Sequence, residues 1–169
     1  MISIPGSAAV DAGVRSPGVN DDFTGANMSD ANLSNASFTN GTLQDVNLAG
    51  ANLTGATFTT VTTGGITGKP AKMPARWLLA DGYLVGPGAL LNSANLTGAN
   101  LTGADIENAE LNSANLAKTN LKNANLSGSA LDDVASGSIT GKPAALPTGW
   151  TLTDGYLIGD QADRYICGI

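Results

Sequence analysis

The sequence predicts an all-β solenoid, and three observations lead to that fold class. A large apolar residue recurs at every fifth position, a small residue (most often Ala) stands two positions before it, and the positions between are mostly Asn, Ser, Thr and Gly. A five-residue period matches neither the period of a helix nor that of a strand. It brings the same position inward each time only if the chain turns a corner every five residues, as short strands wound around an axis do.

The repeats form two runs. From Asp21 they read DDFTG, ANMSD, ANLSN, ASFTN, GTLQD, VNLAG, ANLTG and ATFTT, and from Ala89 they read ALLNS, ANLTG, ANLTG, ADIEN, AELNS, ANLAK, TNLKN, ANLSG and SALDD. A disordered polar tract would not keep so strict an apolar period. We therefore expect the central residues to form the core: Phe23, Met28, Leu33, Phe38, Leu43, Leu48, Leu53, Phe58, Leu91, Leu96, Leu101, Ile106, Leu111, Leu116, Leu121, Leu126 and Leu131.

The stretch ANLTGANLTGADIENAEL resembles the pentapeptide-repeat family, whose motif reads A(N/D)LXX, and seventeen such units cover about half of the chain. The resemblance implies a right-handed quadrilateral β-helix with four pentapeptides in each 20-residue coil, on which Phe38 and Phe58, 20 residues apart, would stack. The Asn that precedes each central residue would then form exposed amide ladders between coils about 4.8 Å apart.

The hexapeptide ITGKPA occurs twice, at 66–71 and at 139–144, and its Gly-Lys pair suggests a phosphate-binding loop. That loop requires the pattern G-x-x-x-x-G-K-[ST], in which backbone amides surround the phosphates and the hydroxyl binds magnesium. Thr63 and Pro70 stand where the first Gly and the Ser/Thr are needed, and the second copy fails in the same way at Ser136 and Pro143. Neither copy is a phosphate loop.

Residues 66–86 and 139–159 align without gaps at an offset of 73, with 14 of 21 positions identical. The chain is therefore interpreted as a tandem duplication within one continuous solenoid domain. Its parts are an N-terminal extension (1–15), a first unit (16–88) closed by a loop and hairpin (62–88), a second unit (89–161) closed by a loop and hairpin (135–161), and a degenerate C-terminal cap (162–169).

Each closing segment carries a hairpin signal. WLLADGYLV and WTLTDGYLI place Asp-Gly between two apolar, β-prone runs, which predicts type I′ turns at Asp81-Gly82 and Asp154-Gly155. The preceding GKPAKMP and GKPAALP are rich in Pro and Gly and predict loops that protrude from the coil. The aromatic residues of the hairpins either anchor an interface with a partner or cover a solenoid face where the repeat has lapsed: Trp77, Tyr83, Trp150 and Tyr156.

The amino-acid composition argues against several classes of function. The net charge is −6, whereas nucleic-acid-binding proteins are usually basic, so no direct nucleic-acid binding is expected. The chain has no histidine and one cysteine, Cys167, which the offset of 73 places in a small inward position with Ile169 at a centre. We expect no catalytic residue, no metal site and no cofactor. Neither a secretory signal nor a membrane-spanning run is visible, which favours a cytoplasmic location.

The charges are patterned along the second run. On a 20-residue coil the carboxylates of Asp105, Glu107, Glu110, Asp132 and Asp133 gather on two adjacent sides, and Lys118 and Lys122 lie on the other two. In the first run Asp21, Asp22 and Asp45 share a side. These carboxylates are candidates for contact with a partner, although carboxylates also keep a solenoid soluble.

Two functional hypotheses follow. The first is a non-catalytic structural or protein-interaction module with an unknown protein partner. The second comes from the resemblance, because some acidic pentapeptide-repeat proteins resemble duplex DNA in size and charge, bind DNA gyrase and protect it against inhibitors. B-DNA carries one charge per about 1.7 Å, so four coils spanning roughly 20 Å would need about twelve negative charges, and the repeats carry nine carboxylates and two lysines. That density, and the lack of a C-terminal helix for dimerisation, favour the interaction module.

Overall fold

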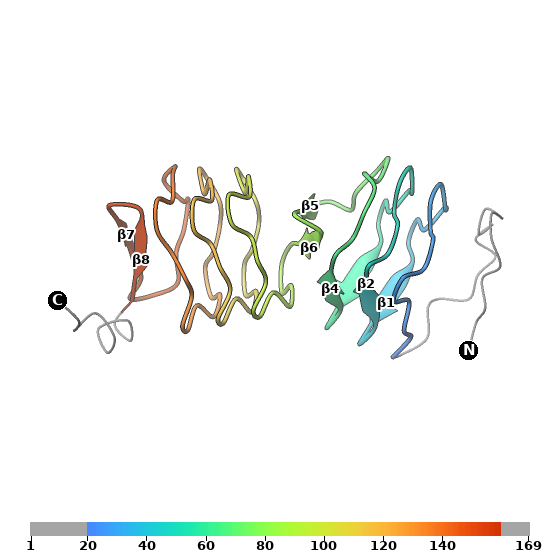
Figure 1. Cartoon of the computed structure of the whole chain (residues 1–169), viewed down its shortest axis with the longest axis horizontal. Coiled ribbons are helices and arrows are strands. Elements are labelled where there is room, and N and C mark those ends of the chain that lie inside the picture. The colour runs from blue at the N-terminus through green and yellow to red at the C-terminus, as the bar shows by residue number, and fades with distance from the viewer. Residues whose placement is uncertain (1–19, 160–169) are drawn as a thin grey trace. The chain divides into compact units, whose positions relative to one another are not determined.

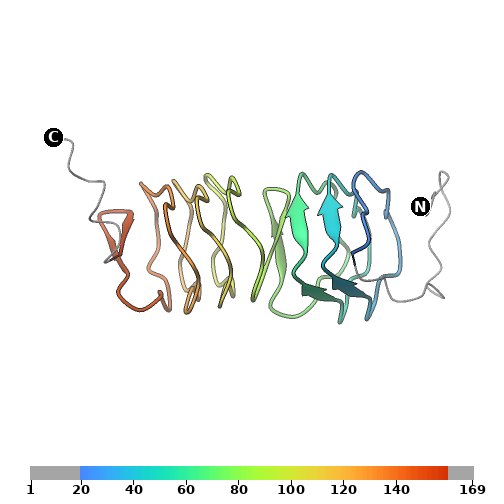
Figure 2. The same cartoon turned by 90° about the horizontal axis from the view of Figure 1, so that it is seen from below.

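The computed structural model describes residues 20–159, and within that range it contains strands, bridges and turns but no helix. The chain divides into two compact units, Met1–Leu84 (unit 1) and Val85–Ile169 (unit 2), which are described separately below. In each unit successive coils stack along an axis (Figures 1 and 2). The eight strands have three residues each: β1 Ser37–Thr39, β2 Thr42–Gln44, β3 Thr57–Thr59, β4 Thr62–Gly64, β5 Leu78–Ala80, β6 Tyr83–Val85, β7 Thr151–Thr153 and β8 Tyr156–Ile158.

The coils of unit 1 are held by parallel pairing between residues 20 positions apart. β1 pairs with β3 and β2 with β4, with Phe38 opposite Phe58 and Thr42 opposite Thr62. Isolated bridges at Asn27↔Asn47 and Asn32↔Asn52 follow the same offset on the other two sides. Four sides per 20 residues confirm the quadrilateral β-helix that the family resemblance implies.

Corners occur at the end of each pentapeptide, where the backbone adopts positive φ. Gly, Asn, Asp and Ser dominate these positions because they tolerate the left-handed region best. The N–H of the next, small residue then donates to the carbonyl of the preceding central residue, as in Ala104 N–H to Leu101 O at 3.0 Å. An Ala fits at this position because its side chain points into the corner, and Ala104 is only 2% exposed.

The asparagine before each central residue stabilises the coil in two ways. Its side-chain oxygen accepts a hydrogen bond from the N–H two residues later, as Asn52 Oδ1 does from Thr54 at 3.1 Å. Its amide nitrogen can donate to the asparagine one coil earlier, as Asn47 Nδ2 does to Asn27 Oδ1 at 3.1 Å. The expected amide ladders are therefore present, at Asn27–Asn47 and, with a longer 3.4 Å contact, at Asn32–Asn52.

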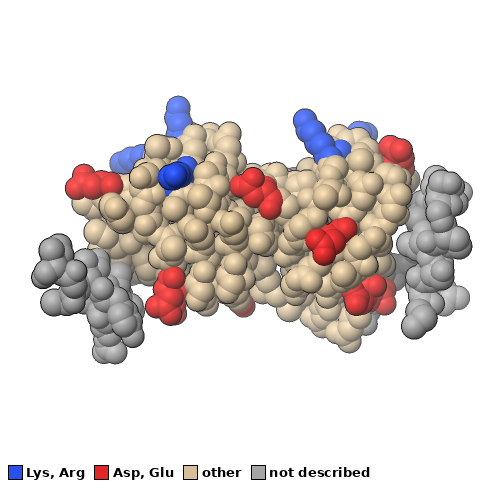
Figure 3. Space-filling model, in the orientation of Figure 1, with Lys and Arg blue, Asp and Glu red and all other residues tan. Residues whose placement is uncertain are grey.

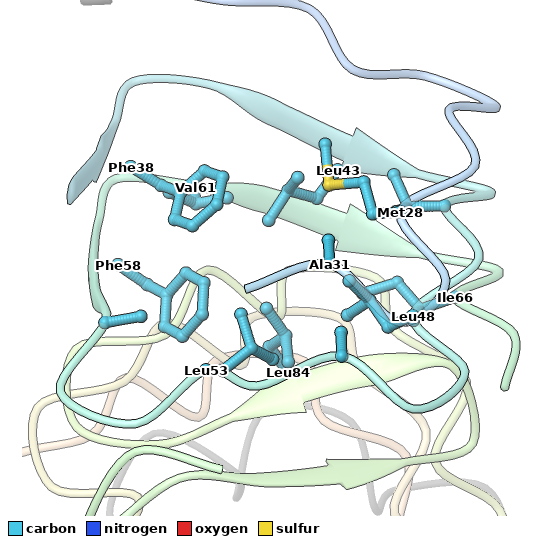
Figure 4. Packing of buried hydrophobic residues seen from close by; sticks show 13 residues of the cluster. Met28, Ala31, Phe38, Leu43, Leu48, Leu53, Phe58, Val61, Ile66 and Leu84 are labelled. Atoms are coloured by element: carbon cyan, nitrogen blue, oxygen red, sulfur yellow. The ribbon is translucent and has the colours of Figure 1, made fainter. Parts of the chain in front are cut away.

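The core of unit 1 contains an aromatic column. Phe38 and Phe58 stack with their ring centroids 5.4 Å apart and 16° between the planes, as the 20-residue offset predicts (Figure 4). Phe23 meets Phe38 edge-on at 5.9 Å. Two expected core residues, Phe23 and Leu33, are only partly buried. Both belong to the first described coil, so among the described residues they have a neighbouring coil on one side only.

The core of unit 2 is more uniform. Its central residues, from Leu91 to Leu131, are all at most 1% exposed, so every one of them is a core residue as expected. Two of the small inward residues are polar, and their side-chain hydroxyls donate hydrogen bonds to backbone carbonyls. Thr119 Oγ1 donates to Leu116 O at 2.8 Å, and Ser129 Oγ donates to Ile106 O at 2.6 Å. These hydroxyls replace Ala without leaving an unpaired buried donor.

The prediction that the Pro/Gly-rich segments protrude is wrong. In unit 1 the segment continues the coil, because Thr67 bridges to Asn47 and Lys72 to Asn52. Its inward residues are spaced by four rather than five, and Ile66, Pro70 and Pro74 are all buried. The positive φ of Gly68 (72°) and its close approach to the backbone of the preceding coil allow this change of spacing. The segment at 139–147 repeats the arrangement in unit 2, with Ile139, Pro143 and Pro147 buried.

The two hairpins form as predicted. β5 pairs with β6, and β7 pairs antiparallel with β8. Both turn residues have positive φ, 46° and 82° at Asp81-Gly82 and 48° and 81° at Asp154-Gly155, which confirms type I′ turns.

The hairpins pack against the coil instead of projecting from it. The turn carbonyl of Gly82 accepts the N–H of Ile66 at 3.0 Å, and Leu84 N–H donates to the buried hydroxyl of Thr63 at 3.3 Å. In unit 2 the same two contacts occur 73 residues later, from Ile139 N–H to Gly155 O at 3.1 Å and from Leu157 N–H to Ser136 Oγ at 3.1 Å. Each hairpin therefore covers the last coil of its unit. The predicted extension (1–15) and cap (162–169), including Cys167 and Ile169, lie outside the described residues.

Candidate functional site

The outward surface of unit 2 has four sides, each marked by a column of bridged residues. The columns run through Leu90–Glu110–Ala130, Asn95–Asn115–Ala135, Asn100–Asn120–Thr140 and Asp105–Asn125–Ala145. Because the bridged residues repeat every 20 positions, each charged residue can be assigned to a side or to the corner that follows it. The carboxylates proposed from the sequence fall on the Asp105 side, on the Glu110 side and at the corners that follow these two sides.

Asp105 and Glu107 form the first part of this acidic surface. Asp105 Oδ1 accepts hydrogen bonds from Asn125 Nδ2 at 3.3 Å and from the N–H of Glu107 at 3.4 Å, so this carboxylate replaces an asparagine in an amide ladder. Both acidic side chains are half-buried. The backbone of Glu107 also pairs with the preceding residues of unit 2, since its carbonyl accepts the N–H of Gly88 at 2.8 Å.

Glu110 and the pair Asp132–Asp133 form the second part. Glu110 Oε2 accepts Asn92 Nδ2 at 2.7 Å, which holds the carboxylate against the neighbouring corner. The N–H of Asp132 donates to Asn112 Oδ1 at 3.0 Å, and Asp133 is the corner residue with φ of 55°. All three side chains are exposed, so these carboxylates are accessible on adjacent coils.

The lysines of unit 2 lie on the other two sides. Lys118 is a corner residue with φ of 62°, and Lys122 follows the Asn120 column. Lys142 lies one coil beyond Lys122, where the N–H of Asn123 donates to its carbonyl at 2.8 Å. All three are exposed, and none forms an ion pair within residues 85–159. In the part coloured yellow to red in Figure 1, Figure 3 shows the blue side chains in the upper half of the view, and red side chains both near them and at the lower edge.

The four aromatic side chains of the hairpin segments are buried to different extents. In unit 1 the ring of Trp77 lies 4.9 Å from that of Phe58 at 60°, and Tyr83 covers Gly64, so both are half-buried parts of the unit. In unit 2 Trp150 is half-buried, whereas Tyr156, which covers Gly137, remains 54% exposed. Among the four aromatic candidates Tyr156 alone leaves most of its surface to solvent.

Unit 1 has its own carboxylates on the first two coils. Hydrogen bonds from the hydroxyl of Thr24 at 2.6 Å and its N–H at 2.9 Å lower the pKa of the Asp22 carboxyl below its usual value. Asp30 and Asp45 are corner residues whose carboxylates lie over Gly50 and Gly65 of the next coil. These side chains are therefore part of the corner packing as well as of the surface charge.

Two features escaped the sequence reasoning. The hydroxyls of Thr63, which is buried, and Ser136, which is half-buried, accept hairpin N–H groups. Both residues stand at a central position where the pattern has a hydroxyl instead of a large apolar residue. The corner pairs of Asx and Gly were also missed, although Asp30 and Gly50 stand 20 residues apart, as do Asn35 and Gly55. Both features can be recognised in the sequence when residues 20 positions apart are compared.

The described residues contain no group of three or more Cys, Asp, Glu or His side chains placed to hold a metal ion. Over the same residues, no helix has the length and apolar character needed to cross a bilayer. Every buried side-chain nitrogen and oxygen of residues 20–159 has a hydrogen-bond partner, so the interior of the coils leaves no polar group for a ligand.

Comparison with known proteins identifies the repeat. A family model for pentapeptide repeats matches residues 22–59 and 88–132, in eight copies. No curated protein sequence gives a significant match.

Solved structures with similar folds include Rfr23, a pentapeptide-repeat protein from the cyanobacterium Cyanothece 51142, with 26% identity and a TM-score of 0.31. The match covers 74% of this chain and 63% of Rfr23. HetL from Nostoc sp. strain PCC 7120, a pentapeptide-repeat protein involved in the regulation of heterocyst differentiation, has 19% identity and a TM-score of 0.42, over 81% of this chain and 68% of HetL. QnrB1, a plasmid-mediated fluoroquinolone resistance protein, has 15% identity and a TM-score of 0.21, over 69% of this chain and 78% of QnrB1. These similarities concern the fold and carry no information on partners.

Proposed function

The chain belongs to the pentapeptide-repeat family, and we propose on this basis that it is a non-catalytic protein-interaction module. The proposal rests mainly on the segregation of charge over residues 89–145 of unit 2, where five carboxylates occupy two neighbouring sides and three lysines occupy the other two; Asp154, in the hairpin turn, lies outside this range. Complementary charge guides the encounter of two proteins and fixes their orientation, and it contributes less to the affinity itself. We infer that the acidic sides of unit 2 contact a basic surface of a protein partner.

The form of the acidic surface suits such a contact. The carboxylates of Asp105 and Glu110 are held by asparagine amides at 3.3 Å and 2.7 Å, so binding a partner costs little additional side-chain entropy. The backbone beneath them is fixed by the ladder of the coils, for example by Leu111 N–H to Ala130 O at 2.9 Å. A rigid scaffold with preset charges favours a partner whose basic groups are similarly spaced.

The test compares two variants with nearly equal net charge. The first neutralises Asp105, Glu107, Glu110, Asp132 and Asp133 by Asp→Asn and Glu→Gln changes, which raises the formal net charge from −6 to −1. The second neutralises Asp21, Asp22, Asp30 and Asp45 of unit 1 in the same way, which raises it from −6 to −2. Proteins captured by the wild type at low and at high salt are identified by mass spectrometry, and the contact is mapped with a carboxyl–amine crosslinker.

We expect a partner whose binding weakens with salt, whose crosslinks fall on the unit 2 carboxylates, and which the first variant loses while the second retains it. Equal loss in both variants would show that net charge alone attracts the partner. Binding that both variants retain would place the contact elsewhere on the molecule. Either of these two results contradicts the proposed surface.

A further inference from the structure

Most asparagines of the described chain have restrained side chains. In nine of them the side-chain oxygen accepts the N–H two residues later: Asn27, Asn32, Asn47, Asn52, Asn95, Asn100, Asn115, Asn120 and Asn125. Asn92 and Asn112 instead accept the N–H of Asn112 and Asp132 of the next coil, at 3.0 Å each. These bonds hold the amide carbon in one place relative to the backbone.

Three corner asparagines are restrained differently, through the residue that follows them. Asn35, Asn108 and Asn123 have positive φ, and each precedes an alanine whose N–H is already bonded. The donors and acceptors are Ala36 N–H to Leu33 O at 3.1 Å, Ala109 N–H to Ile106 O at 3.2 Å, and Ala124 N–H to Leu121 O at 2.9 Å. The following backbone nitrogen is therefore occupied, and the alanine Cβ crowds any approach to it.

Asn40 lacks both restraints. It is exposed, has φ of 51°, and is the one asparagine in the 169-residue sequence that is followed by glycine. Within the described chain its side-chain amide forms no hydrogen bond, and neither does the N–H of Gly41. Gly41 is itself buried, but it has no Cβ to crowd the approach of its nitrogen to the Asn40 side chain.

We propose that Asn40 is a site of spontaneous deamidation. The deprotonated backbone nitrogen of Gly41 attacks Cγ of Asn40, the new N–Cγ bond closes a succinimide ring, and the Cγ–Nδ2 bond breaks to release ammonia. Water then opens the ring at one of its two carbonyl carbons, which leaves either aspartate or isoaspartate at position 40. The sequence of steps consumes one water and needs no oxidant or reductant.

The product affects the corner between β1 and β2. Asn40 N–H donates to Thr59 O at 2.9 Å, and Gly41 O accepts Thr62 N–H at 3.0 Å. Isoaspartate adds one atom to the main chain between these two groups, so both bonds cannot keep their present geometry. Aspartate leaves the main chain unchanged. The isoaspartate form should therefore loosen the contact of this corner with the next coil, and the aspartate form should not.

The experiment ages the intact protein in mildly alkaline buffer at physiological temperature. Peptide mapping by mass spectrometry locates the amide-to-acid conversion, and enzymatic methylation detects isoaspartate. We expect conversion first at Asn40, a rate that rises with pH because the attacking nitrogen must lose its proton, and loss of the methylated product in Asn40→Gln. Asn92 and Asn123 are internal controls, because Asn92 precedes a serine and Asn123 occupies the same kind of corner.

Conversion of Asn92 or Asn123 as fast as Asn40 would overturn the proposal. So would an intact Asn40 in folded protein under conditions where an unfolded peptide of the same sequence reacts. The effect on the corner is measured separately by hydrogen exchange at the Thr62 amide. Aged protein should exchange this proton faster than fresh protein or the Asn40→Asp variant, and equal exchange in all three samples would contradict the structural part of the inference.

Discussion

The carboxylate of Asp30 occupies the place that a Cβ atom on Gly50, one coil later, would take. Both residues are corner residues with positive φ, 58° and 71°. The same relation joins Asn35 to Gly55, Asp45 to Gly65 and Asn108 to Gly128. At these corners glycine is required twice, once for its backbone conformation and once because a side-chain oxygen of the preceding coil fills the space beside it.

A comparison of two glycine substitutions separates these effects. Gly25 has nearly the same φ as Gly50, 69° against 71°, but nothing lies within 4 Å of its Cβ position. We expect Gly25→Ala to cost about 1–2 kcal/mol for the left-handed conformation, and Gly50→Ala to cost about 1–3 kcal/mol more because the added methyl overlaps Asp30. Urea unfolding measures both. Combining Gly50→Ala with Asp30→Ala should recover the additional loss; equal midpoints for the two single variants would refute the role of Asp30.

The core prediction concerns Leu101 and Ala104, which are 0% and 2% exposed. Leu101→Asp buries an unpaired charge and should cost at least about 3 kcal/mol, and Ala104→Leu overfills a corner, at about 1–3 kcal/mol. Thr102→Ser changes an exposed residue between them, keeps the hydroxyl that bonds Asn100 Oδ1 at 2.7 Å, and should be nearly neutral. Thermal unfolding provides the measurement. Wild-type stability of Leu101→Asp would show that the inward positions have been wrongly identified.

These inward positions could be predicted because one rule, a large apolar residue at every fifth position, governs every coil from Phe38 to Phe58 and from Leu91 to Leu131. The closing segments could not be predicted in the same way. At Ile66, Pro70 and Pro74 the spacing changes to four, and the Pro and Gly residues that enable the change also resemble those of a surface loop. The pairing partners of Thr67 and Lys72 were nevertheless readable from the 20-residue offset to Asn47 and Asn52.

The sides of the coil that carry charged residues could be predicted from the sequence, whereas the packing of the hairpins against the coil could not. The difference is whether the coil period alone determines the position of a residue. The side on which Glu110 or Lys122 lies depends only on the coil period. Whether Trp77 packs or projects depends on the contact of its ring with Phe58 at 4.9 Å, which no local pattern encodes. The buried hydroxyl of Thr63 was hidden for the same reason, since its partner, Leu84 N–H, lies 21 residues away on the hairpin.

Thr63 provides a test of hairpin attachment. Thr63→Val keeps the shape of the side chain but removes the oxygen that accepts Leu84 N–H, so a buried donor is left unpaired at a cost of about 1–3 kcal/mol. Thr62→Val makes the same chemical change at the exposed neighbouring position and should alter stability far less. Chemical denaturation measures the difference, and amide exchange at Leu84 reports the local effect. If exchange at Leu84 is unchanged in Thr63→Val, the hydroxyl does not hold the hairpin.

The turn of the first hairpin gives a second local test. Gly82 has φ of 82°, and a Cβ on it would lie 3.0 Å from the backbone nitrogen of Gly65. Gly82→Val therefore introduces both backbone strain and a clash with the coil, whereas Ala80→Val places a β-branched residue in strand β5, where it is favoured. We expect Gly82→Val to lower the melting temperature much more than Ala80→Val. Similar melting temperatures would contradict the type I′ turn and its contact with Gly65.

The last prediction concerns DNA gyrase, the alternative partner implied by the family resemblance. If the acidic sides imitate DNA, the purified protein should inhibit gyrase supercoiling at micromolar concentration or below, and the inhibition should weaken as salt rises because charge steers the encounter. Neutralising Asp105, Glu107, Glu110, Asp132 and Asp133 together should abolish it while circular dichroism and melting remain unchanged.

We expect instead that the wild-type protein leaves supercoiling unaffected. The five carboxylates of residues 89–145 occupy only two of the four sides of unit 2, and Lys118, Lys122 and Lys142 occupy the others, whereas a DNA duplex presents negative charge all around its axis. A partner with a single basic surface can use the acidic sides alone, but an enzyme that surrounds the duplex would also meet the lysines. Inhibition that the five-site variant loses, and that the unit 1 variant keeps, would establish gyrase binding and overturn this expectation.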